Sequence, residues 1–197
     1  MSGAKALQAS FQPWLERLVR PALPLTLLLA IATASLPAQT ARCGVARWPV
    51  KIVVDDDSAR VDLTPRDTTV AALAAMPRPA GLFPQRARVV PEELVTWRVR
   101  AILWEVRVEP DGDLHVILAD PAHTDVRMIA ELPDSACAIG SRHAATYAEV
   151  SRQLRGIGRR QLVTVTGIAF FDHAHGQRNA APNNIELHPV LRIERAP

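Results

Sequence analysis

The chain has 197 residues, of which 48% are hydrophobic and 22% are charged, and this balance excludes a wholly disordered chain and a protein with many membrane spans. Its formal net charge of +3 comes from the first 42 residues, which hold four basic side chains and one acidic side chain. Without them, the 23 basic and 20 acidic residues become 19 of each, so the remainder lacks the excess positive charge that a general nucleic-acid binder needs. The length suits one domain, or one domain with an arm.

The N-terminal segment has the pattern of an export signal. Arg17 and Arg20 precede an apolar run from Leu23 to Ala34, and Ala32-Thr33-Ala34 forms a small-x-small cleavage site. The run is shorter than the roughly 20 apolar residues of a membrane span. We therefore predict a signal peptide over residues 1–38, cleaved between residues 34 and 42, and a periplasmic or extracellular protein with no stable membrane span. An uncleaved N-terminal anchor is the alternative.

The chain contains two cysteines, Cys43 and Cys137. In an oxidising compartment an even number of cysteines favours a disulfide. The bond would close a loop of about 94 residues, which the chain-entropy model values at roughly 4 kcal/mol. Two unpaired thiols are the alternative, and neither cysteine has the spacing to another Cys or His that a zinc finger requires.

Residues 39–93 are expected to form an N-terminal arm with one short helix. The β-rich piece from Val50 to Val54 predicts a strand, and an acidic run follows it. Thr64, Pro65 and Asp67 together predict the start of a helix. Residues 77–91 contain four prolines and predict an irregular connection to the next part of the chain.

From residue 94 onward the pattern is that of strands. We expect five of them over residues 95–108, 114–118, 126–132, 163–171 and 185–193, with one helix over residues 141–157. The apolar phase of the first strand slips at Ile102, which predicts a bulge that bends the strand. A helix between the third and fourth strands is typical of the oligonucleotide/oligosaccharide-binding (OB) fold, so we predict a mainly β protein with a small five-stranded OB-like Greek-key barrel over residues 94–197. Another small antiparallel α+β sheet is the alternative.

Three segments resemble a family of exported bacterial proteins to which no activity is assigned. These are the start Cys43-Gly-Val-Ala-Arg-Trp-Pro-Val-Lys51, the segment from Gly167 to Gln177 with Phe-Phe-Asp-His-Ala-His-Gly-Gln, and the segment from Ala181 to Val190 with Pro-Asn-Asn-Ile-Glu-Leu-His-Pro. The resemblance implies export and a single domain, and it supplies no catalytic residues.

Alternation along the strands places a second set of side chains on the outer face of the barrel. The second, third and fifth strands of an OB barrel are neighbours, and OB folds bind ligands around the second and third strands and the adjoining loops. We therefore predict a ligand-binding face on the outer surface of these three strands and on the loop over residues 172–184, which is expected to fold back over the face. Its residues are Asp113, His115, Glu131, Asp172, His175, Glu186 and His188.

Imidazoles and carboxylates together can bind zinc or another divalent metal, the one cofactor these residues suggest, or position a water for hydrolysis. Their spacing matches no metalloprotease motif, and a structural or loop-ordering role is the alternative. The first functional hypothesis is an exported binding or interaction module for a small polar ligand, a saccharide or a protein. The second is a divalent-metal-assisted hydrolase, with phosphodiesters as candidate substrates. Neither hypothesis assigns a catalytic residue.

Overall fold

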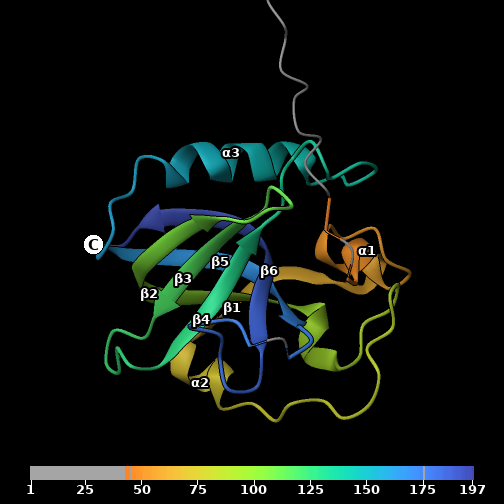
Figure 1. Ribbon diagram of the computed structural model, residues 1–197, viewed down its shortest axis with the longest axis horizontal. Helices are drawn as coiled ribbons and strands as arrows, with labels where there is room; N and C mark the ends of the chain where they lie inside the picture. Colours follow the sequence, from red (N-terminus) through yellow and green to blue (C-terminus); the bar gives the residue numbers. More distant parts are fainter. Residues whose placement is uncertain (1–42, 45, 175) are drawn as a thin grey trace, which may run out of the picture. The chain divides into compact units, whose positions relative to one another are not determined.

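The computed structural model describes residues 43–44, 46–174 and 176–197 (Figure 1). The predicted signal peptide and its cleavage site lie outside these residues. Within the described part, no helix has the length and apolar character to cross a membrane.

Five strands close into a barrel. They are β2 (Val95–Val108), β3 (Leu114–Ala119), β4 (Arg127–Leu132), β5 (Leu162–Phe171) and β6 (Ile185–Arg195). Their order is β2-β3-β4-β6-β5, and β5 pairs with β2 to complete the ring. The helix α3 (Ala144–Leu154), the longest among the described residues, connects β4 to β5 (Figure 1). The predicted mainly β, OB-like Greek-key barrel is thereby confirmed.

Strand β2 serves two partners because it is long and bent. Its residues Thr96 to Ile102 pair with β5, and its residues Ile102 to Val108 pair with β3. The pairing with β3 shifts register between Leu103 and Glu105, which is the bulge that the slipped apolar phase predicts. The bend lets one strand belong to both sides of a small barrel.

The barrel interior is filled by the apolar side chains that alternate along the strands, including Val99, Leu118, Met128 and Val165, all of which are buried. Helix α3 packs against β4 and β6 and covers one end of the barrel with Tyr147, Val150 and Leu154 (Figure 1). In β6 the register shifts, so strict alternation is interrupted and Val190 rather than Pro189 belongs to the core cluster.

The arm contains more structure than the sequence predicts. It consists of α1 (Trp48–Lys51), the 3-10 helix η1 (Ser58–Arg60), β1 (Asp62–Thr68), α2 (Val70–Ala74) and the 3-10 helix η2 (Pro91–Leu94). Arm and barrel form one compact unit.

Two predictions for the arm are wrong. The expected strand at Val50 to Val54 begins instead as α1, because Pro49 occupies its first turn and suits a helix start. The expected helix start at Thr64 is instead β1, which pairs in parallel with β2. An edge strand tolerates Pro65, since the amide missing from proline is not needed on the open side. Helix α2 begins after Thr69, whose side chain accepts a hydrogen bond from the amide of Ala72.

Arg47 joins the arm to the barrel. Its guanidinium makes a bidentate ion pair with Glu93, at 2.7 and 2.9 Å, and also donates to the carbonyls of Phe171, Ala87 and Pro84. All five donors of the buried side chain are therefore satisfied. Glu93 in turn accepts from the amides of Phe171 and Val89.

The predicted disulfide is present between Cys43 and Cys137, whose Cα atoms lie 5.4 Å apart. It ties the first described residue of the arm to the segment between β4 and α3. A disulfide is typical of an oxidising, extracytoplasmic environment.

Candidate functional site

Strand register brings the predicted site residues together. His115 of β3 is the pairing partner of Glu131 of β4, and Ile129 of β4 pairs with Glu186 of β6. Two residues further along these parallel strands, His188 comes beside Glu131. The prediction that the three strands are neighbours, with these side chains on one face, is confirmed.

This face is not exposed, in contrast to the predicted outer surface. Asp113, His115, Glu131, Glu186 and His188 expose only between 0 and 7% of their surface. The reason is that two segments cover them. The arm contributes Lys51, and the loop over residues 172–184 closes the other side, held by a hydrogen bond from Arg127 to Asn179. The polar face of the barrel is thus a second, buried layer.

Glu131 is the centre of the cluster. Its Oε1 lies 2.6 Å from Nε2 of His115, and its Oε2 lies 2.7 Å from Nδ1 of His188. The Nζ of Lys51 donates to Oε2 at 3.3 Å. The two imidazole contacts have ion-pair distances but lack the alignment of hydrogen bonds, so Oε1 of Glu131 and both ring nitrogens of His188 have no hydrogen-bond partner among the described residues.

Burial and charge divide the carboxyl groups into two states. Burial raises the pKa of Glu131, but the charge of His188, the contacts with both histidines and the charge of Lys51 outweigh it and hold the pKa well below its usual range. Burial raises the pKa of Glu186 well above its usual range, and the charges of Glu131 and Asp172 raise it further. Burial also raises the pKa of Asp113, to about 7. The surroundings therefore favour the ionised form of Glu131 and the protonated form of Glu186.

The bases respond to the same charges. Burial lowers the pKa of Lys51, but the surrounding carboxylates, Glu131 first, outweigh burial and raise it. Burial also lowers the pKa of His115, yet its contact with Glu131 and the charges of Glu131 and Glu109 raise the pKa overall. For His188 burial prevails, and the pKa falls below its ordinary value. Lys51 is thus a permanent cation inside the cluster, whereas burial favours the neutral form of the His188 imidazole.

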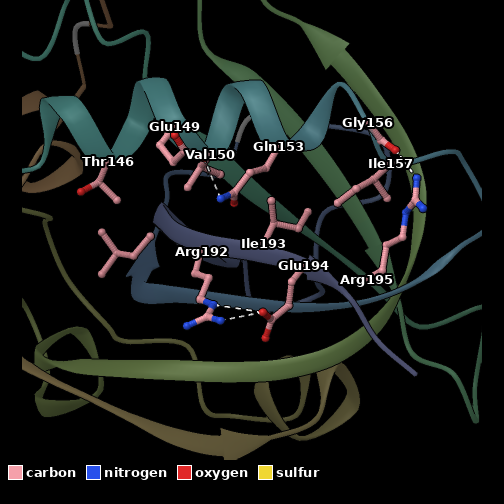
Figure 2. A pocket seen from close by; sticks show the side chains of 11 residues that line it. Thr146, Glu149, Val150, Gln153, Gly156, Ile157, Arg192, Ile193, Glu194 and Arg195 are labelled. Atoms are coloured by element: carbon pink, nitrogen blue, oxygen red, sulfur yellow. Dashed lines mark hydrogen bonds and ion pairs between the residues drawn. The ribbon is translucent and has the colours of Figure 1, made fainter.

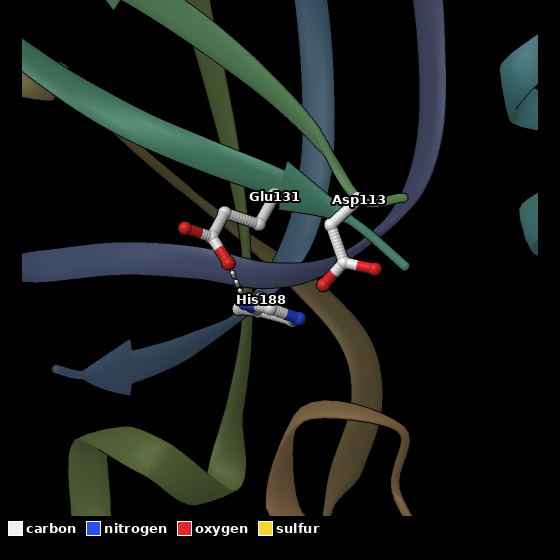
Figure 3. Close-up of side chains that lie close together, drawn as sticks. All are labelled: Asp113, Glu131 and His188. Atoms are coloured by element: carbon white, nitrogen blue, oxygen red, sulfur yellow. Dashed lines mark ion pairs between the residues drawn. The ribbon is translucent and has the colours of Figure 1, made fainter. Parts of the chain in front are cut away.

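Three side chains form a candidate metal centre. Asp113, from the turn before β3, Glu131, from β4, and His188, from β6, point toward one another (Figure 3). Each offers one ligand atom, and these atoms all lie within 4.8 Å of one another. Oδ2 of Asp113 and Nε2 of His188 are buried without a hydrogen-bond partner among the described residues. Buried polar atoms in proteins normally have partners, so these two atoms are available to bind an ion or a water.

An open cleft of about 430 Å³ leads to the cluster. It is lined by the start of the arm, the turn between β2 and β3, and the loop after β5. His115, Glu131 and Lys51 reach its wall, and so does Asp172. A second hollow of about 260 Å³ lies along the loop and reaches Glu186. The cleft therefore occupies the place, between the two loops, where OB folds bind their ligands.

A groove at the other side of the molecule has a different character. It holds about 520 Å³ between α3 and the second half of β6 (Figure 2). Arg192 and Glu194 form an ion pair with each other there, and the groove contains no buried titratable group. Arg192 thus lies apart from the candidate site, although it belongs to the same strand as Glu186 and His188.

Sequence reasoning missed Lys51, which contacts Glu131. Lys51 stands in a predicted strand that is in fact a helical turn, so alternation could not assign its direction. The glycine in the Cys-Gly-x-x-Arg-Trp start has a steric reason, because a Cβ on Gly44 would lie 2.8 Å from the ring of Trp48. Asn183, in the loop that closes the site, donates to the carbonyls of Leu73 and Met76 and has a structural role. His175 lies outside the described residues.

Comparisons with models of known protein families, with curated proteins and with solved structures find no match for this chain.

Proposed function

We propose that the protein is an exported module that binds a divalent cation, with zinc as the first candidate, through Asp113, Glu131 and His188. One observation carries the proposal: three ligand-type atoms from three separate elements converge within 4.8 Å of one another in a buried place. One imidazole and two carboxylates suit zinc and similar borderline metals better than magnesium or calcium, which prefer oxygen ligands alone.

The surrounding contacts support this choice. A zinc ion with bonds of about 2.0–2.2 Å keeps its ligand atoms roughly 3.3 Å apart, so the three side chains need to close only slightly around an ion. Nε2 of His115 contacts Oε1 of Glu131 at 2.6 Å and would orient the carboxylate of Glu131 for the ion. A divalent cation would also be attracted by the negative charge of Glu131 and by that of Asp113 when Asp113 is ionised. Export itself rests on the disulfide and on the Arg-flanked apolar run at residues 17–34.

The test is a calorimetric titration of zinc ions into protein that has been treated with a chelator and dialysed. We expect one zinc per chain, with magnesium and calcium binding at least ten-fold more weakly. Asp113→Asn keeps the shape and the acceptor that the amide of Asp134 uses, but it removes the ligand charge and should weaken zinc binding at least ten-fold. Asp111→Asn is the matched control, because Asp111 lines the same cleft and loses the same charge. Absence of zinc binding, or equal weakening by both substitutions, would overturn the proposal.

Metal-assisted hydrolysis is the second candidate function, and the cleft favours it. Catalytic zinc sites keep three protein ligands and one open position, and Glu131 and His115 are both reachable from the cleft. The permanent cation Lys51 would stabilise an anionic transition state there. Zinc-dependent hydrolysis of bis(p-nitrophenyl) phosphate that disappears in Asp113→Asn would support this function. Zinc binding without such turnover would support the binding function and contradict the hydrolase function.

A further inference from the structure

A group of arginines surrounds Trp104 on the outer side of β2. The guanidinium carbons of Arg127 and Arg160 lie 3.7 and 3.1 Å from the centre of the Trp104 ring. Two guanidinium groups this close to one ring centre cannot share a face, so they cover both faces. Trp104 stands at the bulge of β2, where two residues oppose one on β3 and the strand turns its side chains outward.

Three further arginines extend this surface. Arg159 donates through Nε to the carbonyl of Trp104 at 3.3 Å. Arg107 pairs with Glu105 at 3.1 Å. Contact with Arg107, together with the charges of Arg107, Arg159 and Arg178, lowers the pKa of Glu105, so all three lie within electrostatic reach of it. We call this set the basic face: Arg107, Arg127, Arg159, Arg160 and Arg178.

The charge of the basic face is not balanced locally. In the part of the chain that the structure describes, Arg107 has an ion-pair partner, whereas Arg127, Arg159, Arg160 and Arg178 have none. The chain from residue 43 onward is neutral as a whole, so this concentration of unpaired guanidinium groups is a local feature. Unpaired arginines that are fixed side by side are suited to bidentate recognition of carboxylate, sulfate or phosphate groups.

We propose that the basic face binds an acidic polysaccharide, a linear chain of carboxylate-bearing sugars. Guanidinium groups stacked on Trp104 present their N–H edges as a rigid fork, which matches a row of carboxylates. Nucleic acid fits less well, because both faces of Trp104 are covered and leave no platform for a base. A membrane surface also fits less well. The exposed Val106 and Val108 pair with Val116 and Leu114 and point to the opposite face of β2 from Arg107, so these apolar side chains do not lie on the basic face.

The experiment uses a size-defined polygalacturonate oligomer as the probe and the whole mature chain, with binding measured at 50 and 200 mM NaCl. We expect binding that weakens at least ten-fold between the two salt concentrations, since ionic contacts are screened and release counterions. Arg159→Gln combined with Arg160→Asn should weaken binding at least ten-fold at low salt. Asparagine is chosen because Arg160 has a φ of 65°, which asparagine tolerates.

The matched control is Arg152→Gln combined with Arg155→Gln, which removes the same charge from the exposed end of α3. It should leave binding within two-fold of the unchanged protein. Arg178→Gln serves as a second, single variant on a loop, should the double variant show altered thermal unfolding. Equal loss in both double variants, no binding of polygalacturonate, or tighter binding of a single-stranded oligonucleotide or of phosphatidylglycerol vesicles would each overturn the proposal. The basic face shares no residue with the metal cluster, so the two proposals fail independently.

Discussion

Strand β6 carries titratable side chains along its whole length, but its two halves place them in opposite environments. Glu186 and His188, in the first half, are buried under the arm and the loop over residues 172–184. Arg192 and Glu194, in the second half, leave 68% and 46% of their side chains exposed beside the groove under α3 (Figure 2). The same strand therefore contains both a buried polar site and an ordinary solvated surface.

The covering segments cause the difference. The first half of β6 lies beneath an arm that is fixed by the Arg47–Glu93 ion pair, by the disulfide and by the hydrogen bonds that Ser141 and Tyr147 donate to the carbonyl of Ile52. Burying several titratable groups costs free energy unless they gain partners. A fold that retains such a cluster under a firmly attached cover is consistent with a ligand-binding role, whereas the exposed half needs no such explanation.

The largest expected effect comes from breaking the attachment of the cover. Arg47→Met leaves Glu93 buried without its partner, and breaking a buried pair in this way should lower the free energy of unfolding by about 3–5 kcal/mol. Arg192→Met removes the same side chain from the exposed half and should change stability by no more than about 0.5 kcal/mol. Urea unfolding followed by tryptophan fluorescence measures both. Similar losses for the two variants would show that the halves do not differ as described.

The disulfide is the next attachment to break. Cys43→Ser combined with Cys137→Ser should lower the free energy of unfolding by about 2–4 kcal/mol, because the unfolded chain regains the freedom of a long loop. Reduction of the unchanged protein should produce the same loss in urea unfolding. A double variant as stable as the oxidised protein would mean that the disulfide does not secure the cover.

The pH dependence separates the buried half through Asp113. Its pKa is about 7 in the folded protein and 3.8 in the reference state. Between about pH 4 and pH 7 Asp113 keeps its proton in the folded protein but loses it in the unfolded chain. The contribution of Asp113 to the free energy of unfolding is therefore fully present below about pH 4 and is lost as the pH rises through 7. In the presence of a chelator, Asp113→Asn should lack this loss and gain about 4 kcal/mol over the unchanged protein between pH 4 and pH 8. Parallel pH profiles in urea unfolding would contradict the burial of a protonated Asp113.

The smallest effect concerns the cation within the site. Lys51→Met removes a positive charge that lies 3.3 Å from Oε2 of Glu131 and that would repel a bound metal. Zinc affinity should rise about ten-fold, equivalent to roughly 1.4 kcal/mol. Calorimetric titration measures the change, and Arg192→Met, which removes a cation from the exposed half, should leave affinity unaltered. Weaker zinc binding in Lys51→Met would show that the lysine supports the site.

The barrel could be predicted from the sequence because its signals are local. Alternation in β2, β3, β4 and β5 depends only on neighbouring residues of each strand. The bulge in β2 is visible as a slip of the apolar phase over a few residues. The disulfide follows from an even number of cysteines. The same alternation places Glu131, Glu186 and His188 on one face, and the predicted strand order brings them together.

Only the tertiary structure decided the arm and the burial of the site. Residues 62–68 are a strand because the open edge of β2 supplies hydrogen-bond partners, which outweigh a local pattern that favours a helix start. Arg47 and Lys51 reach the barrel through long-range contacts that no spacing in the sequence reports. Alternation by itself determines which face of a strand a side chain occupies, whereas the exposure of that face depends on which distant segment covers it. For this reason the sequence alone determined the polar face of the barrel, and the packed arm made it a buried cluster.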